Sequence, residues 1–197
     1  MVAPVEQRGG NYSPQEVAGF SHTFQQVAKR YAVGTPQPRR DSLIENKFSR
    51  TSVQIWGQTA HVRDSVRSGE VKLPTAYVEG ACDAAAVMQM VSLIESGTPR
   101  PSDGTWYWRP YPGAQEEVFA RMQHLFSAMA AIVKDPSYFS NDPNYVSDTE
   151  SHRRELIAFA LDELKSSRQR SQTSQAEEYL LGMEVVRQQW RNLSGQA

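Results

Sequence analysis

Cysteine and long apolar runs are scarce in this chain of 197 residues. Cys82 is its single cysteine, so a framework of intrachain disulfide bonds is excluded. No apolar run approaches the roughly 20 residues that a membrane-spanning helix requires, and residues 1–8 lack the apolar core of a secretory signal peptide. We therefore expect an intracellular protein, or one that belongs to a virion assembled inside a cell, with no membrane partner.

Recognisable catalytic motifs are missing as well. The chain contains no glycine-rich phosphate loop, no paired-cysteine zinc pattern and no His-Glu-x-x-His sequence. The Glu-x-x-His step of di-iron bundles is absent, because His152 and Glu155 stand in the reverse order and are more typical of an exposed charge pair. Cys82 falls in a strongly apolar segment, where burial would raise its pKa and make it a poor nucleophile. The sequence therefore predicts a protein that is not an enzyme and that holds no metal or cofactor.

Charge of neither sign dominates the composition. The formal net charge is -1, so bulk electrostatics favour neither nucleic acid nor a membrane surface. The distribution is uneven, because basic residues outnumber acidic ones over residues 1–70 and the reverse holds over residues 71–150. Arginine is much commoner than lysine. Its guanidinium suits bidentate contacts with phosphate or carboxylate, although a GC-rich genome would enrich arginine too.

Apolar residues recur at helical spacing through most of the chain, and no alternating strand pattern persists beyond a few residues. The expected fold class is all-α: a single helical bundle of about five to seven helices with aromatic connecting loops. Residues 1–12 are predicted to form a flexible N-terminal arm and residues 13–197 the bundle domain. No repeat of fixed period is visible. The predicted helices lie near residues 13–31, within 42–69, and over 75–96, 114–134, 149–166 and 174–190.

Several details of these helices are open to test. Ser13 and Glu16 predict a capping box with proline at the first helical position, and Gly34 is a natural end for that helix. Residues 42–69 are compatible with a short helix followed by a longer one, and the pattern does not decide between one helix and two. Residues 75–96 are apolar on most sides, which is typical of a helix at the centre of a bundle. His22 and His124 are predicted to be half-buried packing residues.

A basic region precedes the central helix. Few acidic residues interrupt it, and two of its arginines, Arg63 and Arg67, would lie one turn apart if residues 52–67 are helical. Such a face can follow a phosphate backbone, although a solvated, salt-bridged face has the same composition. The candidate nucleic-acid-binding residues are Arg39, Arg40, Lys47, Arg50, Arg63 and Arg67.

Two loops are rich in aromatic residues. In an extended segment Trp106 and Trp108 would point to one side, and Tyr107 and Arg109 to the other. Such a loop could cover the core, contact a protein partner, or stack on bases. The helix between the two loops would hold them roughly 30 Å apart, so they favour head-to-tail contacts between subunits. The candidate contact residues are Trp106, Tyr107, Trp108, Arg109, Tyr111, Tyr138, Phe139 and Tyr145.

Three functions remain open on this basis. The favoured one is a non-enzymatic, self-assembling coat protein of viral capsid or nucleocapsid type, which packages single-stranded RNA through its arginine-rich face and has itself as a partner. The second is a helical adaptor or effector of bacterial or phage origin that binds a protein through its Trp-rich loop. The third is an enzyme with an unrecognised site near Glu79, Asp83, His124 and Arg109.

Overall fold

The computed structural model describes residues 12–31, 47–95, 117–118, 120–125, 149–170 and 176–194. Residues 117–118 and 120–125 are also helical, and we call them the fourth helical segment. No strand occurs in these ranges, so the predicted all-α bundle is confirmed. The helices with defined bounds are α1 (Pro14–Arg30), α2 (Lys47–Arg67), α3 (Thr75–Glu95), α5 (Thr149–Arg170) and α6 (Ala176–Ser194).

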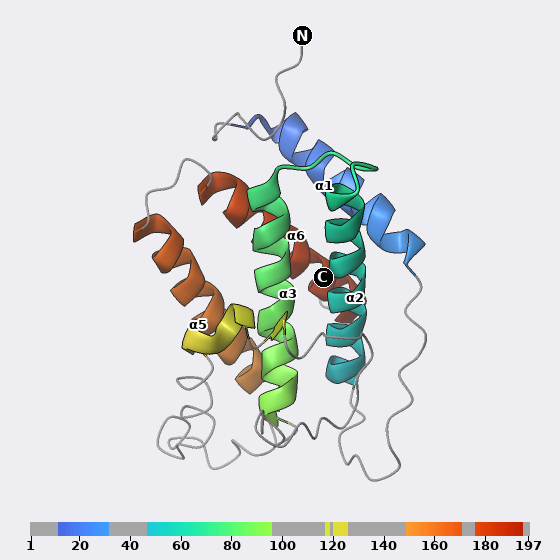
Figure 1. Cartoon of the computed structure of the whole chain (residues 1–197). Coiled ribbons are helices and arrows are strands. Elements are labelled where there is room, and N and C mark those ends of the chain that lie inside the picture. The colour runs from blue at the N-terminus through green and yellow to red at the C-terminus, as the bar shows by residue number, and fades with distance from the viewer. Residues whose placement is uncertain are drawn as a thin grey trace.

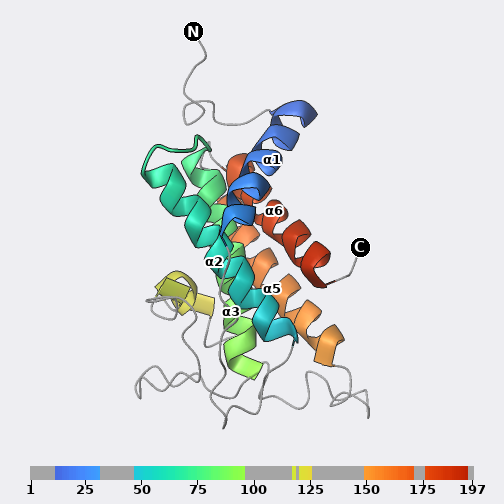
Figure 2. The same cartoon turned by 90° about the vertical axis from the view of Figure 1, so that its right-hand side faces the viewer.

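Helix α3 lies at the centre of the bundle. In Figure 1 it stands between α2 and α5, while α6 crosses it on the far side. Figure 2 shows the same crossing from the side, with α1 lying across the upper part of α2 and α6. Residues 77–78, 80–82 and 84–92 of α3 are all buried. The central position predicted from its apolar composition is therefore correct.

Helix α1 begins as its sequence predicts. The backbone N–H of Ser13 donates to the Glu16 carboxylate at 2.8 Å, and the backbone N–H of Glu16 donates to the Ser13 hydroxyl at 3.2 Å. These bonds satisfy N–H groups that would otherwise lack partners at a helix start. The helix ends at Arg30, before the expected stop at Gly34, because Tyr31 has extended dihedral angles. Tyr31 stacks on His61 of α2 with ring centroids 5.2 Å apart.

Residues 47–67 form one continuous helix, so no break between two helices falls within them, and residues 42–46 lie outside the described residues. A tight turn follows, in which the backbone N–H of Ser68 donates to the Asp64 carbonyl at 2.9 Å. Gly69 has a φ of 82°, a left-handed conformation that glycine adopts without steric cost. The turn sends α3 back along α2, and the buried Gln89 and Ser52 side chains join the two helices by a 2.8 Å hydrogen bond.

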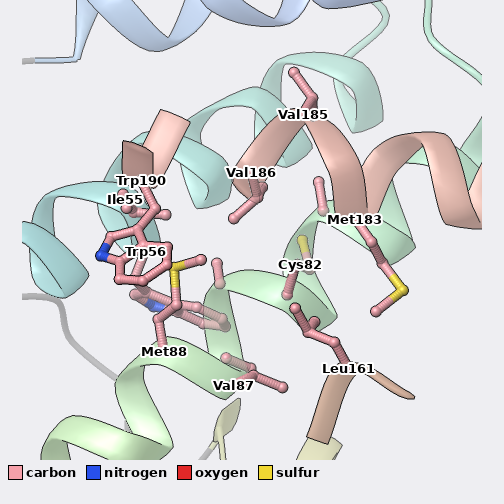
Figure 3. Packing of buried hydrophobic residues seen from close by; sticks show 14 of the residues in the cluster. Ile55, Trp56, Cys82, Val87, Met88, Leu161, Met183, Val185, Val186 and Trp190 are labelled. Atoms are coloured by element: carbon pink, nitrogen blue, oxygen red, sulfur yellow. The ribbon is translucent and has the colours of Figure 1, made fainter. Parts of the chain in front are cut away.

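Large side chains from α2, α3, α5 and α6 fill the core. Figure 3 shows Trp56 and Trp190 near Met88, with Val87 and Leu161 further along the same layer. Trp56 is 1% exposed and Trp190 8% exposed. Interdigitated apolar packing of this kind is the main favourable term in folding.

The closest helix contact is the crossing of α3 with α6. A Cβ atom at Gly80 would lie 2.8 Å from the carbonyl carbon of Tyr179, and one at Gly182 would lie 2.7 Å from the carbonyl carbon of Tyr77. Real Cβ atoms essentially never approach within 3.0 Å. Only glycine at both positions therefore lets the two backbones meet.

Two local predictions are wrong. His22 and His124 are exposed rather than half-buried. Both stand beside an apolar stripe, and helical periodicity locates the edge of a stripe only to within about one residue. Helix α5 continues to Arg170, beyond the predicted end near residue 166, because Arg and Gln are good helix formers.

Candidate functional site

Charged side chains from distant parts of the chain meet beside the α3–α6 crossing. We call this group the Arg121 cluster. It draws on α2, α3, α6 and the fourth helical segment, so it joins four elements of the bundle. Its members are Arg63, Asp64, Glu79, Asp83, Glu117, Arg121 and Tyr179.

Arg121 is the centre of the cluster. One guanidinium nitrogen, Nη1, lies 2.8 Å from a Glu79 oxygen and 2.9 Å from an Asp83 oxygen. The Nε and Nη2 atoms each lie 3.1 Å from Glu117, one helical turn earlier. Burial opposes the charge on Arg121, but the hydrogen bond to Glu79 and the nearby carboxylates outweigh it and raise its pKa above the ordinary value. Arg121 therefore stays charged while its side chain is only 14% exposed.

Arg63 extends the cluster into α2. Its guanidinium donates to Glu117 through Nη1 and to Asp64 through Nε, the latter at 3.2 Å. The Arg63 side chain is 8% exposed. Burial opposes its charge, but the hydrogen bond and the charge of Glu117 act more strongly together and raise the pKa of Arg63. Glu117 is thus shared by two arginines and links the fourth helical segment to α2.

Tyr179 closes the cluster on the α6 side. Its hydroxyl donates to the second carboxylate oxygen of Asp83 at 2.6 Å, a short bond of the kind expected between a hydroxyl and a carboxylate. Cys82 stands next to Asp83 in α3 and is 1% exposed. Burial raises the pKa of its thiol to about 12, although the charges of Arg121 and Arg63 act in the opposite direction. The predicted raised pKa of a buried thiol is therefore confirmed.

The cluster is built to hold helices together. Four carboxylates surround two guanidinium groups, and each guanidinium contacts at least two carboxylates. No group of three or more potential metal ligands occurs within the described ranges. Charge-assisted hydrogen bonds between four elements give a specific geometry, and removing one member would leave buried partners without compensation.

Of the predicted nucleic-acid-binding residues, Arg63 and Arg67 have described side chains, and their surroundings differ. Arg67 is exposed at the end of α2, one turn beyond the buried Arg63. The expected shared basic face is therefore not formed, because Arg63 turns inward to Glu117 and Asp64. Lys47 and Arg50 lie on α2 with side chains that are not described, and Arg39 and Arg40 fall outside the described residues.

Both predicted aromatic loops also fall outside the described residues, as do all the contact residues assigned to them, from Trp106 to Tyr111 and from Tyr138 to Tyr145. The alternative site near Glu79 and Asp83 is reached by Arg121, whereas His124 is exposed and Arg109 is not described. The side chains of Glu79 and Asp83 are 34% and 14% exposed, and both pair with Arg121.

Glu117 and Arg121 were missed by the sequence analysis. They stand four residues apart in a helical segment, which is the spacing of a helix ion pair, but that spacing is common on exposed faces. A stronger signal was available in α3, where Glu79 and Asp83 interrupt an otherwise apolar helix. Buried acidic groups of this kind require a cationic partner, and Arg121 is the one arginine within the predicted helix 114–134.

A second buried carboxylate lies at the start of α6. Glu178 is 2% exposed, and one of its oxygens accepts a 2.9 Å hydrogen bond from the Tyr12 hydroxyl. The other oxygen has no hydrogen-bond partner among the described residues. Tyr12 packs edge-on against Phe20 with ring centroids 5.1 Å apart. Tyr12, which was assigned to the flexible arm, is therefore held against both α1 and α6.

An exposed basic surface lies where α1 ends beside the α2–α3 turn. Arg30 and Glu70 approach to 3.4 Å and are each 59% exposed, which places these two elements side by side. We call this surface the basic corner. Its four cationic residues are all exposed and are Lys29, Arg30, Arg67 and Lys72.

Comparison of the chain with protein-family models, curated proteins and solved structures gave no match. No helix in the described part of the chain is long and apolar enough to cross a membrane.

Proposed function

We propose that this chain is a non-enzymatic structural protein that assembles with copies of itself and packages single-stranded nucleic acid, in the manner of a viral coat protein. The observation that carries the nucleic-acid part is the basic corner. It presents four exposed cations, one of which, Arg30, pairs with the exposed Glu70. Exposed Lys and Arg groups on adjoining elements can neutralise successive phosphates.

The Arg121 cluster supports a structural role rather than a reacting centre. Its arginines are occupied by carboxylates of the same chain, and the neighbouring Cys82 is protonated at neutral pH because burial raises its pKa to about 12. A protonated, buried thiol is a weak nucleophile. A cluster whose charged groups pair with one another across four elements suits a subunit that must keep one shape in an assembly.

The basic corner is tested by measuring single-stranded RNA binding as a function of salt. Arg67→Ala removes one exposed cation, so we expect weaker binding and a slope of log K against log salt that falls by about 0.7. Lys165→Ala is the control, since Lys165 is also exposed but belongs to α5, which lies on the other side of α3 from α2. An unchanged slope for Arg67→Ala, or an equal loss for Lys165→Ala, would remove the basic corner from the proposal.

The assembly part is tested with the Trp-rich loop. If that loop supplies a subunit contact, Trp108→Ala should reduce the sedimentation coefficient of the assembled protein while the unfolding midpoint stays close to that of the wild type. A variant that unfolds would instead assign Trp108 to the core. A wild-type chain that remains monomeric and binds no RNA would favour the alternative of a helical adaptor for a protein partner.

A further inference from the structure

Tyrosine–glycine pairs occupy equivalent positions in α3 and α6. Tyr77 precedes Gly80 by three residues, and Tyr179 precedes Gly182 by the same number. Each glycine faces the backbone of the tyrosine in the other helix. Gly80 thus faces Tyr179 just as Gly182 faces Tyr77. Contacts that repeat in this reciprocal way are the property of a two-fold interface.

The helices that precede α3 and α6 keep the same register. Ile157 of α5 follows Ile55 of α2 by the same number of residues as Tyr179 follows Tyr77. Leu164 of α5 follows Val62 of α2 by that number too. All four of these α2 and α5 residues are buried. The chain therefore contains two similar units, an N-terminal one of α1, α2 and α3 and a C-terminal one of the fourth helical segment, α5 and α6.

Contacts between the two units are reciprocal as well. Helix α1 contacts α6, and Tyr12, just before α1, donates to Glu178 of α6, while the fourth helical segment contacts α3 through Arg121 and Glu79. Helix α2 packs on α6, and α5 packs on α3. The units differ inside, since α2 packs extensively on α3 whereas α5 contacts α6 little in the described ranges. Helix α1 packs mainly on α2 of its own unit, and its contact with α6 is smaller.

We propose that the two units exchange between copies of the chain, so that α3 of one copy crosses α6 of a second copy at Gly80 and Gly182. This inference rests on the self-assembly proposed above and names the surface that performs it. The contacts between units already exist within one chain, so exchange requires no additional interface and is a low-cost route to association.

The length of the connection permits exchange. Residues 96–116 join α3 to the fourth helical segment, and a chain of that length spans at most about 75 Å when extended. The helices of a bundle lie roughly 10 Å apart. A connection of this length is therefore long enough for α3 to cross α6 of the same copy or α6 of a second copy. The contacts at Gly80 and Gly182 are the same in both cases.

A complementation experiment with the full-length chain tests the exchange. Gly80→Leu and Gly182→Leu each introduce a side chain where the opposite backbone leaves no room. The two variants carry different affinity tags and are denatured and refolded separately or together. Gly19→Leu is the control, because a Cβ atom at Gly19 meets nothing within 4 Å.

Exchange predicts a specific rescue. Each crossing variant refolded alone should lose helical signal, whereas Gly19→Leu should resemble the wild type. When the two variants exchange units, one of the two crossings joins α3 of the Gly182→Leu chain to α6 of the Gly80→Leu chain. Neither helix in that crossing carries a substitution. Co-refolding should therefore recover helical signal and give several-fold more co-purification of both tags than mixing after separate refolding.

Other outcomes would overturn the inference. An oligomeric wild type without rescue would leave self-assembly in place but assign it to another surface. Crossing variants that refold alone like the wild type would show that the glycine contact is not required. A wild type that stays monomeric in analytical ultracentrifugation would contradict both the exchange and the self-assembly on which it rests.

Discussion

Gly182→Ala should destabilise the protein although alanine is the better helix former. The new Cβ atom would lie 2.7 Å from the Tyr77 carbonyl carbon, and the obstacle is backbone that cannot change rotamer. Because carbon atoms pack at about 3.5–4.0 Å, and the Tyr77 carbonyl oxygen would lie closer still to the new Cβ atom, α3 and α6 would have to separate locally by more than about 1 Å. Overpacking of this kind costs about 1–3 kcal/mol, and we take the upper end for a backbone obstacle. The gain in helix propensity returns about 1 kcal/mol, so the net loss should be about 2 kcal/mol.

Gly19→Ala provides the matched comparison. Gly19 is exposed in α1 and a Cβ atom there meets nothing within 4 Å, so the same substitution should stabilise the protein by about 1 kcal/mol. Urea unfolding followed by circular dichroism measures both values, with the m-value checked for constancy. The two variants should differ by about 3 kcal/mol. Equal stabilisation by both substitutions would refute the close crossing of α3 and α6.

Further predictions concern the buried polar groups. Arg121→Ala should lower the free energy of unfolding by about 2–3 kcal/mol, since it leaves partly buried carboxylates uncompensated, whereas removal of the exposed Arg187 should cost no more than about 0.5 kcal/mol. Cys82→Ala should make the free energy of unfolding fall less steeply as the pH rises from 9 to 12. The unfolded thiol loses its proton near pH 9 but the folded one near pH 12, so in the wild type each pH unit between them costs about 1.4 kcal/mol. Urea titrations from pH 8 to 11 should show this difference in slope, and parallel curves would contradict it. Tyr12→Phe removes the donor to the buried Glu178 and should cost about 1–3 kcal/mol; a neutral result would show that water replaces the donor.

The elements of the fold follow closely from local patterns. The capping box at Ser13, the stripe that buries Phe24 and the apolar composition of residues 75–96 each depend on neighbours within one or two turns. Such signals are read from spacing alone. The α3–α6 crossing has a weaker local signal, since Gly80 and Gly182 read only as unfavourable residues inside helices. The two similar units were missed because they share buried positions and few identities.

The candidate site was harder to predict because its partners are distant in sequence. Arg63 looked like half of an exposed basic face with Arg67, and nothing near it in the chain indicates Glu117 as its partner. Burial of a charged group is decided by tertiary packing and by the available counter-charge. Helical spacing gives the angle between Arg63 and Arg67 around α2 but does not tell which of the two faces a neighbouring helix.

Sedimentation of the full-length protein, with and without single-stranded RNA, tests the central proposal most directly. Self-assembly on nucleic acid predicts species larger than the 22.2 kDa monomer at high protein concentration. It also predicts a further increase in size when RNA is added at low salt, with reversal at high salt. A single 22.2 kDa species under every one of these conditions would contradict it.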